Sequence, residues 1–267
     1  DEEVFEMNNG CICCTVRGDL IRILTGLMKR AGSLDAILIE TTGVADPAPV
    51  AQTFFVDDDV AEKTRLDAVV TMVDAVHCER QLEESHEAPE QIAFADIVLL
   101  NKTDLVDATD IARIEERIRG MNPYCRIIAT DRCDAPLDQV LGQNAFDLKR
   151  VLEVEPDFLE SDHDHEHDDA VTSVSVEADR PLDPDRFQRW FSRLLQEKGQ
   201  DILRAKGILD IDGESERYVV QGVHMLMDSD FMGPWPSGQA RRSRLVFIGR
   251  GLENLELEKG FAACQAA

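Results

Sequence analysis

The sequence predicts an α/β protein with a doubly wound, mostly parallel β-sheet followed by a small α+β domain. Short apolar runs alternate with helical patterns over residues 1–150, which is typical of right-handed crossovers in a parallel sheet. Residues 171–267 mix strand-like segments with helices and lack long crossovers, which indicates an α+β domain. An acidic, His-rich stretch at residues 151–170 separates the two patterns, and its composition predicts a solvated linker.

The strands of the first domain are predicted from continuous apolar runs, because such runs suit strands buried on both faces. These runs are Ala36–Ile39, Ala68–Val73, Ile97–Leu100 and Ile127–Ile128, and strand-like sequence also opens the chain at Val4–Met7. Apolar residues at helical spacing predict a helix over residues 19–30, with Asp19 as its N-cap. They predict a second helix over residues 108–119, ending at Gly120.

The second domain combines shorter strands with two amphipathic helices. Its predicted strands are Val171–Val176, Ile208–Ile211, Tyr218–Leu226 and Arg244–Ile248. One helix is predicted over Asp185–Gln196, where the aromatic residues fall on one face, and a short one over Leu252–Ala263 closes the domain.

Composition excludes two classes of function. The chain carries 28 Lys and Arg against 53 Asp and Glu, a net charge of −25, which argues against a duplex nucleic-acid binder because phosphate contacts need clustered cations. No apolar run approaches the ~18 to 20 residues of a membrane span, so we predict that this is not an integral membrane protein. A nucleotide bound with Mg²⁺ stays compatible with this charge, since backbone amides and the cation carry the interaction.

The seven cysteines favour a reducing compartment, because their odd number and clustering do not fit a secreted disulfide framework. No secretory signal follows Asp1, which predicts a cytoplasmic protein whose natural N-terminus lies upstream, where a targeting segment could still direct it to an organelle. Four cysteines are predicted to be small apolar core residues, namely Cys78, Cys125, Cys133 and Cys264.

The strongest motif is Asn101-Lys102-Thr103-Asp104, directly after the run Ile97–Leu100. Doubly wound sheets bind ligands at the carboxyl ends of their strands. A carboxylate at Asp104 can accept hydrogen bonds from the ring N–H and the exocyclic amino group of guanine, a donor pair that adenine lacks. Asn101 is predicted to brace the loop and face the base, and the stem of Lys102 to pack along the ring. The motif therefore predicts GTP or GDP as the ligand, against the alternative of a chance match in a polar loop.

Further polar groups follow the other predicted strands. Glu40-Thr41-Thr42-Gly43 comes after Ala36–Ile39, and we predict that Glu40 supports Mg²⁺ while Gly43 lets the backbone reach the γ-phosphate, which makes both candidate catalytic residues. Thr130, after Ile127–Ile128, is predicted to begin a loop that closes over the base. Asp74 ends the run at 68–73, where a binding role and a plain turn fit equally well.

Cys11, Cys13 and Cys14 place three thiols within four residues. Thiolates bind soft or borderline ions such as Zn²⁺, Cu⁺ and Co²⁺, and the helix start and Arg17 nearby would favour the thiolate form. A fourth ligand has to come from another residue, from water or from a client protein, which suits metal transfer better than a permanent structural site. The C-x-x-C spacing of Cys11 and Cys14 leaves a redox role as the alternative.

His163, His165 and His167 are interleaved with carboxylates in the linker. Residues 153–169 hold nine acidic residues, these three histidines and no Lys or Arg. Imidazole and carboxylate suit Zn²⁺, Ni²⁺ or Co²⁺ at modest affinity, so we predict a metal-gathering loop. The alternative is a solvated acidic linker that merely contains histidine.

No phosphate-binding loop of the form G-x-x-x-x-G-K-[ST] occurs, and the chain contains no Gly-Lys dipeptide. Without this loop no lysine reaches the β- and γ-phosphates and no hydroxyl holds Mg²⁺. The 267 residues are therefore expected to dock guanine but to hold a triphosphate poorly.

In combination these motifs resemble the CobW-like G3E GTPases, metallochaperones related to the nickel-insertion GTPases of urease and hydrogenase. The resemblance rests on six segments, which cover nearly the whole chain: Glu6–Arg17 with its C-x-C-C motif, Glu40–Gly43, Val73–His77, Asn101–Asp104, Arg204–Leu209 and Leu245–Leu252. It implies a P-loop GTPase-like domain, a His-rich linker and a small C-terminal domain. In the family a strand, the P-loop and the first switch precede C-x-C-C, so a truncation of roughly the leading 50 to 80 residues fits the start at Asp1.

The resemblance implies GTP-dependent delivery of Zn²⁺ or Co²⁺ to a client metalloprotein, with Mg²⁺ accompanying GTP. Our first hypothesis is that Cys11, Cys13 and Cys14 hold the ion and that hydrolysis shifts them between holding and releasing states. The second is a non-catalytic metal buffer with a degenerate nucleotide site. The third is a thiol–disulfide protein that uses Cys11 and Cys14.

Overall fold

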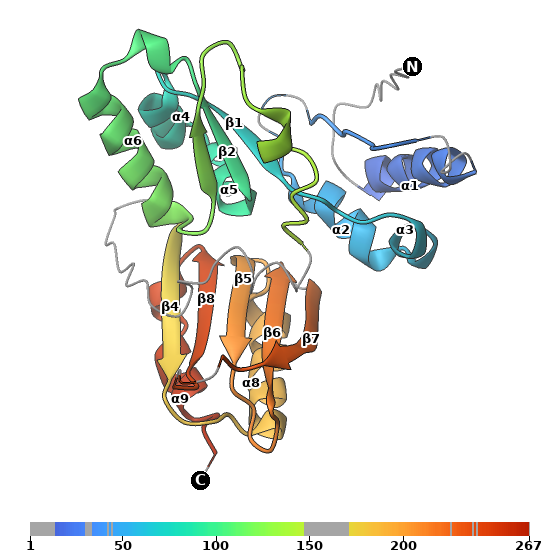
Figure 1. Ribbon diagram of the computed structural model, residues 1–267, viewed down its shortest axis with the longest axis vertical. Coiled ribbons are helices and arrows are strands. Elements are labelled where there is room, and N and C mark those ends of the chain that lie inside the picture. The colour runs from blue at the N-terminus through green and yellow to red at the C-terminus, as the bar shows by residue number, and fades with distance from the viewer. Residues whose placement is uncertain are drawn as a thin grey trace. The chain divides into compact units, whose positions relative to one another are not determined.

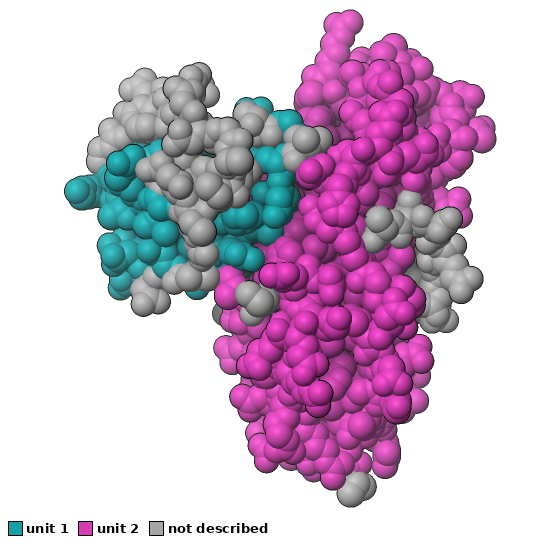
Figure 2. Space-filling model, turned by 180° about the vertical axis from the view of Figure 1, so that it is seen from behind, with its two compact units in different colours: residues 1–66 teal, residues 67–267 magenta. Residues whose placement is uncertain are grey.

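The computed structural model describes residues 14–29, 34–41, 43, 45–146, 171–224, 226–236, 238 and 240–266. The chain separates into two compact units, residues 1–66 and residues 67–267 (Figure 2). No helix in these residue ranges is both long and apolar enough to cross a membrane.

The regular elements in the described part of the first unit are helices. They are α1 (Cys14–Met28), α2 (Ala48–Val56) and α3 (Asp58–Lys63). Leu20 and Leu24 of α1 pack with Val60 of α3 in a small apolar cluster. Asp57 caps α3, because its carboxylate accepts a hydrogen bond from the Val60 N–H at 3.0 Å.

Two predictions for this unit are wrong. Residues 36–39 do not form a strand, and Leu38 is 80 % exposed. An apolar run becomes a strand only where a neighbouring strand accepts its backbone hydrogen bonds, and the described part of this unit supplies helices alone. Asp19 is not an N-cap, because α1 begins at Cys14 and runs through this position.

The second unit starts with a three-stranded parallel sheet. Its strands β1 (Val70–Asp74), β2 (Ile97–Asn101) and β3 (Arg126–Ala129) lie in the order β1-β2-β3 (Figure 1). The helices that connect and cover them are α4 (Cys78–Glu84), α5 (Glu87–Phe94) and α6 (Ala108–Met121). The central strand β2 is buried from Ile97 to Leu100, as its apolar run predicts.

Helix α6 follows the predicted pattern closely. Asp107 caps it by accepting hydrogen bonds from the N–H groups of Thr109 and Asp110, both at 2.9 Å. Ile114 and Ile118 are buried against β2 and its neighbours in the core of this sheet. The helix ends one residue beyond the predicted Gly120.

A five-stranded antiparallel sheet completes the unit, in the order β4-β8-β5-β6-β7 (Figure 1). Its elements are β4 (Thr172–Ala178), α8 (Pro184–Lys198), β5 (Ile202–Leu209), β6 (Glu216–Val223), β7 (Leu226–Pro234), β8 (Ser243–Gly249) and α9 (Leu257–Ala262). Phe187 and Phe191 of α8 pack with Phe247 of β8 and Phe261 of α9 in the core. Gly260 allows the close approach of α9 to α8, since a Cβ there would lie 2.1 Å from the Trp190 Nε1.

The α/β fold followed by an α+β domain is therefore confirmed, with three local differences. The helix predicted over Leu252–Ala263 is divided into a short 3-10 helix (Leu252–Asn254) and α9. The predicted strand 218–226 is two strands, because His224 adopts a left-handed conformation (φ 51°) and the chain reverses into β7. Strand β5 begins at Ile202 and includes Arg204 and Lys206, which are buried. The domain limits at residues 150 and 171 stay predictions.

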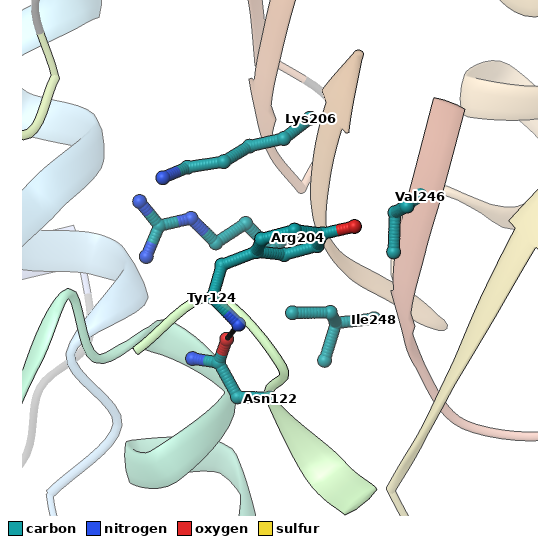
Figure 3. A pocket seen from close by; sticks show the side chains of 6 residues that line it. All are labelled: Asn122, Tyr124, Arg204, Lys206, Val246 and Ile248. Carbon is teal, nitrogen blue, oxygen red and sulfur yellow. Dashed lines mark hydrogen bonds between the residues drawn. The ribbon is translucent and has the colours of Figure 1, made fainter. Parts of the chain in front are cut away.

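Charged and apolar side chains of the antiparallel sheet both face the segment that follows α6: Arg204 and Lys206 of β5 and Val246 and Ile248 of β8 line one small space with Asn122 and Tyr124 (Figure 3). Arg204 and Lys206 leave β5 in the same direction, toward the segment that carries Tyr124. The Arg204 guanidinium pairs with Asp96, just before β2, and its Nη1 donates to the Phe94 carbonyl at 2.8 Å. The interior space that these residues line leaves no room for a water molecule.

Candidate functional site

The candidate site lies at the carboxyl ends of the three parallel strands. Asp74 of β1 stands opposite Asn101 of β2, and Leu100 stands opposite Ala129 of β3. Because parallel strands end at the same edge of a sheet, Asp74, Asn101 and Thr130 emerge side by side. The sequence predicted this placement, and it puts the Asn101–Asp104 motif where ligands bind in folds of this type.

The turn after β2 depends on Lys102. Its φ of 64° places it in the left-handed region, which costs a non-glycine residue about 1 kcal/mol. The next residue holds the turn by hydrogen bonds to the end of β3, since the Thr103 N–H and hydroxyl both donate to the Thr130 carbonyl, at 3.3 and 3.0 Å. The short helix η2 (Thr103–Leu105) follows, and it leaves Asp104 exposed at the surface.

Asn101 joins β2 to the loop that follows β3. Its Oδ1 accepts hydrogen bonds from the Cys133 N–H at 2.9 Å and from the Thr130 hydroxyl at 3.2 Å. Its Nδ2 donates to the Cys133 Sγ at 3.2 Å. Thr130 itself is 3 % exposed, so its side chain positions Asn101. The predicted bracing of the loop by Asn101 is seen, whereas contact of Thr130 with a nucleotide stays a prediction.

Lys102 and Asp74 form an ion pair across β1 and β2, with 2.7 Å between Nζ and Oδ2. Partial burial alone would raise the pKa of Asp74. The hydrogen bond from Lys102 and the one from the Val76 N–H outweigh that effect, so the pKa lies below its usual value.

Asp104 shares its surface with Asp131. The pKa of Asp131 is raised, first by partial desolvation and then by the negative charge of Asp104 and a hydrogen bond between the two carboxyl groups. Both side chains are exposed, so the effect on stability is small. The two exposed carboxyl groups form an acceptor-rich surface, which suits a ligand with several N–H donors.

Glu40 and Gly43 belong to the first unit. Glu40 is exposed, and Gly43 has a φ of 59°, a conformation that favours glycine. The left-handed turn fits the role predicted for Gly43, which is to bring backbone close to a phosphate. Placement of both residues at the nucleotide stays a prediction.

The predicted metal ligands lie mostly outside the described residues. This holds for Cys11, Cys13, His163, His165 and His167, while Cys14 is the first residue of α1. Among the residues that the structure does describe, no group of three or more His, Cys, Asp or Glu is placed to hold a metal ion. The metal site is therefore argued from the sequence.

Two family models match this chain. Residues 1–129 match the CobW/HypB/UreG nucleotide-binding domain, and residues 171–265 match the cobalamin synthesis protein cobW C-terminal domain. A zinc chaperone of Escherichia coli, YjiA, is 34 % identical over 97 % of this chain and 81 % of its own length. The chain belongs to the CobW family.

Other CobW-family members give the same picture. A zinc-regulated GTPase metalloprotein activator of Schizosaccharomyces pombe is 30 % identical over 95 % of this chain and 70 % of its own length. The crystal structure of Zn(II)-bound YjiA GTPase from E. coli matches with a TM-score of 0.79 at 31 % identity, covering 92 % of this chain and 76 % of that one. The fold predicted from the sequence is thus the fold of a CobW-family GTPase.

Sequence reasoning missed two residues of the site in this CobW-family protein, Asp131 and Cys133. Cys133 was predicted to be a core cysteine, but it is exposed and contacts Asn101. Cys78, Cys125 and Cys264 are buried as predicted, and burial raises the pKa of Cys125 to about 12. The polar sequence around Cys133, Asp131-Arg132-Cys133-Asp134, was the signal that could have separated it from the other three.

Proposed function

We propose that this CobW-family protein is a GTP-dependent metallochaperone. It binds Zn²⁺, or Co²⁺, through Cys11, Cys13 and Cys14 and delivers the ion to a client metalloprotein when GTP is hydrolysed. Glu40 supports Mg²⁺, and Gly43 brings the backbone to the γ-phosphate. The relatives named zinc chaperone and zinc-regulated GTPase metalloprotein activator support this proposal.

The observation that carries the nucleotide part is the arrangement of Asn101, Lys102 and Asp104 at the end of β2. Asn101 already holds the loop that begins at Thr130, so this loop is ordered before a base arrives. Asp104 is exposed and presents two acceptor oxygens. Guanine offers a matching donor pair at its ring N–H and amino group, whereas adenine would leave the carboxylate without donors.

The substitution Asp104→Asn tests base recognition. An amide presents one donor and one acceptor group, so it mismatches guanine but fits xanthine, which carries a carbonyl oxygen in place of the amino group. GDP binding is expected to weaken about 100-fold or more, while the affinity for xanthosine diphosphate rises. Both affinities are measured by isothermal titration calorimetry.

Asp110→Asn is the matched control, because Asp110 is also an aspartate just after β2 but lies on α6, paired with Arg113 at 2.7 Å. It is expected to bind GDP like the unsubstituted protein. Equal affinity of Asp104→Asn and the unsubstituted protein for GDP would show that Asp104 does not read the base, and preference for ADP would refute guanine recognition altogether.

The metal part rests on the C-x-C-C motif. The sequence places the three thiols within four residues, with Arg17 nearby. A neighbouring positive charge favours the thiolate form, which raises both metal affinity and reactivity. His163, His165 and His167 are proposed to gather the ion at lower affinity.

Zinc affinity in the two nucleotide states tests the coupling. Competition with a chromophoric chelator is expected to give different Zn²⁺ affinities with GDP and with a non-hydrolysable GTP analogue, and Cys13→Ser to weaken both. Equal affinity in both states would favour the second candidate, a metal-binding protein without a catalytic nucleotide site. Thiol alkylation that added zinc leaves unchanged would favour a thiol–disulfide role for Cys11 and Cys14.

The second candidate has one observation in its favour. The 267 residues contain no G-x-x-x-x-G-K-[ST] loop, so no lysine of this type neutralises the β- and γ-phosphates. We propose that these residues taken alone hydrolyse GTP slowly. We also propose that the protein acts in the cytoplasm and has no nucleic-acid or membrane partner. Phosphate release measured on this chain, with and without Zn²⁺, tests the expected slow hydrolysis.

A further inference from the structure

The ion pair between Asp74 and Lys102 connects β1 to the base-recognition motif. Both oxygens of the Asp74 carboxylate are engaged, because Oδ1 accepts the Val76 N–H at 2.9 Å and Oδ2 accepts Lys102 Nζ at 2.7 Å. The Asp74 carbonyl also accepts the His77 N–H at 3.1 Å. The turn after β1 therefore holds this carboxylate in one orientation before any ligand binds.

The backbone of the motif is tied to the same turn. The Ala75 N–H donates to the Asn101 carbonyl at 2.9 Å, next to the left-handed residue Lys102. Residues 74–75 thus hold the start of the motif twice, once through the backbone and once through the Lys102 ammonium group. No other acceptor of Lys102 Nζ is seen among the described residues.

The exposures of the two side chains show what the pair does to Lys102. Its side chain is 48 % exposed, whereas that of Asp74 is 22 % exposed. The ammonium end is paired at β1, while about half of the Lys102 side chain stays open to solvent. An anchored, partly exposed methylene stem two residues before the exposed acceptor Asp104 suits a platform for a flat, donor-rich ring.

We propose that Asp74 is a positioning residue for guanine binding, acting by anchoring Lys102 so that its stem forms the surface on which the base packs. This inference rests on the proposed nucleotide function and adds a residue to it. Immobilising a lysine side chain costs conformational entropy. Because Asp74 immobilises Lys102 in the free protein, this cost is not added to the free energy of nucleotide binding.

Two other roles for Asp74 predict different behaviour. A carboxylate at a strand end could support Mg²⁺ at a phosphate, in which case its removal would affect GTP with Mg²⁺ far more than GDP alone. A turn residue could act on stability alone, in which case its substitution would lower nucleotide affinity only in proportion to the loss of folding stability. An anchor for the base predicts an equal loss for GDP and GTP, with or without Mg²⁺, because both carry the same base.

A double-mutant cycle tests the anchor. Asp74→Asn keeps the shape and an acceptor for Val76 but removes the charge that holds Lys102. Lys102→Met keeps an apolar stem without an ammonium group. Glu197→Gln is the matched control, since it removes an exposed ion pair of similar length, 2.8 Å to Arg193, on the distant helix α8.

Affinity for fluorescent mant-GDP is measured for each variant, with competition by unlabelled GDP and GTP. Asp74→Asn is expected to weaken both nucleotides about tenfold, and Glu197→Gln to change neither. In the Lys102→Met background, Asp74→Asn is expected to cause no further loss, because no ammonium group remains to be anchored. Thermal melting of the apo proteins is expected to place Asp74→Asn within a few degrees of Glu197→Gln.

Three results would overturn the inference. The first is an additive double-mutant cycle. The second is a loss of affinity in Asp74→Asn that is confined to GTP with Mg²⁺. The third is a loss of affinity that is matched by a fall in the melting temperature. The proposed function fails separately, if the unsubstituted protein and Glu197→Gln do not bind mant-GDP or if Asp104→Asn binds it normally. If Asp104→Asn weakens GDP binding as expected but the double-mutant cycle is additive, the role of Asp74 is refuted and guanine recognition by Asp104 still holds.

Discussion

Cys133 occupies an uncommon position beside the candidate base site. It follows Arg132, and both residues are left-handed, with φ values of 61° and 49°. Two consecutive non-glycine residues in this region are strained, so other contacts have to hold them. The Asn101 side chain supplies these contacts at the Cys133 N–H and Sγ. The loop conformation therefore depends on Asn101, which is the residue that the motif places at the end of β2.

The exposed thiol of Cys133 gives a prediction about reactivity. In a variant with Cys11, Cys13 and Cys14 changed to Ser, four cysteines remain, three of them buried. The pKa of Cys125 is raised to about 12 and that of Cys264 to about 11, mainly by burial, so both stay protonated and react slowly at pH 8. The exposed thiol of Cys133 is expected to react with iodoacetamide about 100-fold faster than the other three thiols.

The control for this prediction is Cys133→Ser in the same background. It keeps an acceptor for Asn101 and is expected to remove the fast phase completely, as followed by intact-mass spectrometry. A second fast thiol would mean that a residue described as buried becomes accessible in solution, and an unreactive Cys133 would mean that its contact with Asn101 shields the sulfur.

At the scale of single elements, local sequence predicts the structure best where one pattern has one explanation. Strand β2 is central and buried on both faces, so its apolar run identifies it directly. Helices α6 and α8 each begin at an aspartate that caps them, Asp107 and Asp183, and each carries a clear apolar face. Neither kind of element needs knowledge of its neighbours to be recognised.

Elements that depend on their neighbours are predicted less well. The run at 36–39 has the composition of a buried strand but does not form one in the described residues. Strand β7 carries Asp228, Ser229 and Asp230 in its centre and is exposed along an edge, so its sequence looks like a loop. The short helices α2 to α5 are likewise absent from the prediction, because a helix of six to nine residues shows too few turns for a clear period.

The same division applies to the candidate site. Asn101, Lys102 and Asp104 are adjacent in the sequence, so their shared place at the end of β2 follows from the strand prediction alone. The contacts of Asp74 with Lys102 and of Cys133 with Asn101 join residues 28 and 32 positions apart. Such contacts follow from strand order and register, which the sequence of one chain does not determine by itself.

At the scale of the second unit, one buried charge cluster joins the antiparallel sheet to the parallel one. Asp96 precedes β2 and pairs with Arg204 of β5, and their side chains are 4 % and 3 % exposed. Asp96 also accepts the Val69 N–H at 2.9 Å, before β1, and Lys206 Nζ lies 4.0 Å from its carboxylate. Charged residues are rarely buried this fully, which explains why sequence reasoning began β5 beyond them.

The buried pair predicts a large loss of stability when one partner is removed. Arg204→Leu leaves the Asp96 carboxylate buried without its main counter-charge, so the free energy of unfolding is expected to fall by about 3–5 kcal/mol in urea denaturation. The double variant Asp96→Asn with Arg204→Leu is expected to lose less than Arg204→Leu alone, because it no longer buries the Asp96 carboxylate without Arg204 and an amide oxygen can still accept the Val69 N–H.

An exposed arginine on a neighbouring strand end provides the comparison. Arg242 pairs with Asp179 at 2.9 Å with both side chains exposed, and Arg242→Ala is expected to cost less than about 1 kcal/mol. Equal losses for Arg204→Leu and Arg242→Ala would contradict the role assigned to the buried pair. The predicted order carries a consequence for function: Asp96 immediately precedes β2, and Asn101 is its last residue. Stability that the antiparallel sheet lends to Asp96 therefore also supports the strand from which the base-recognition motif emerges.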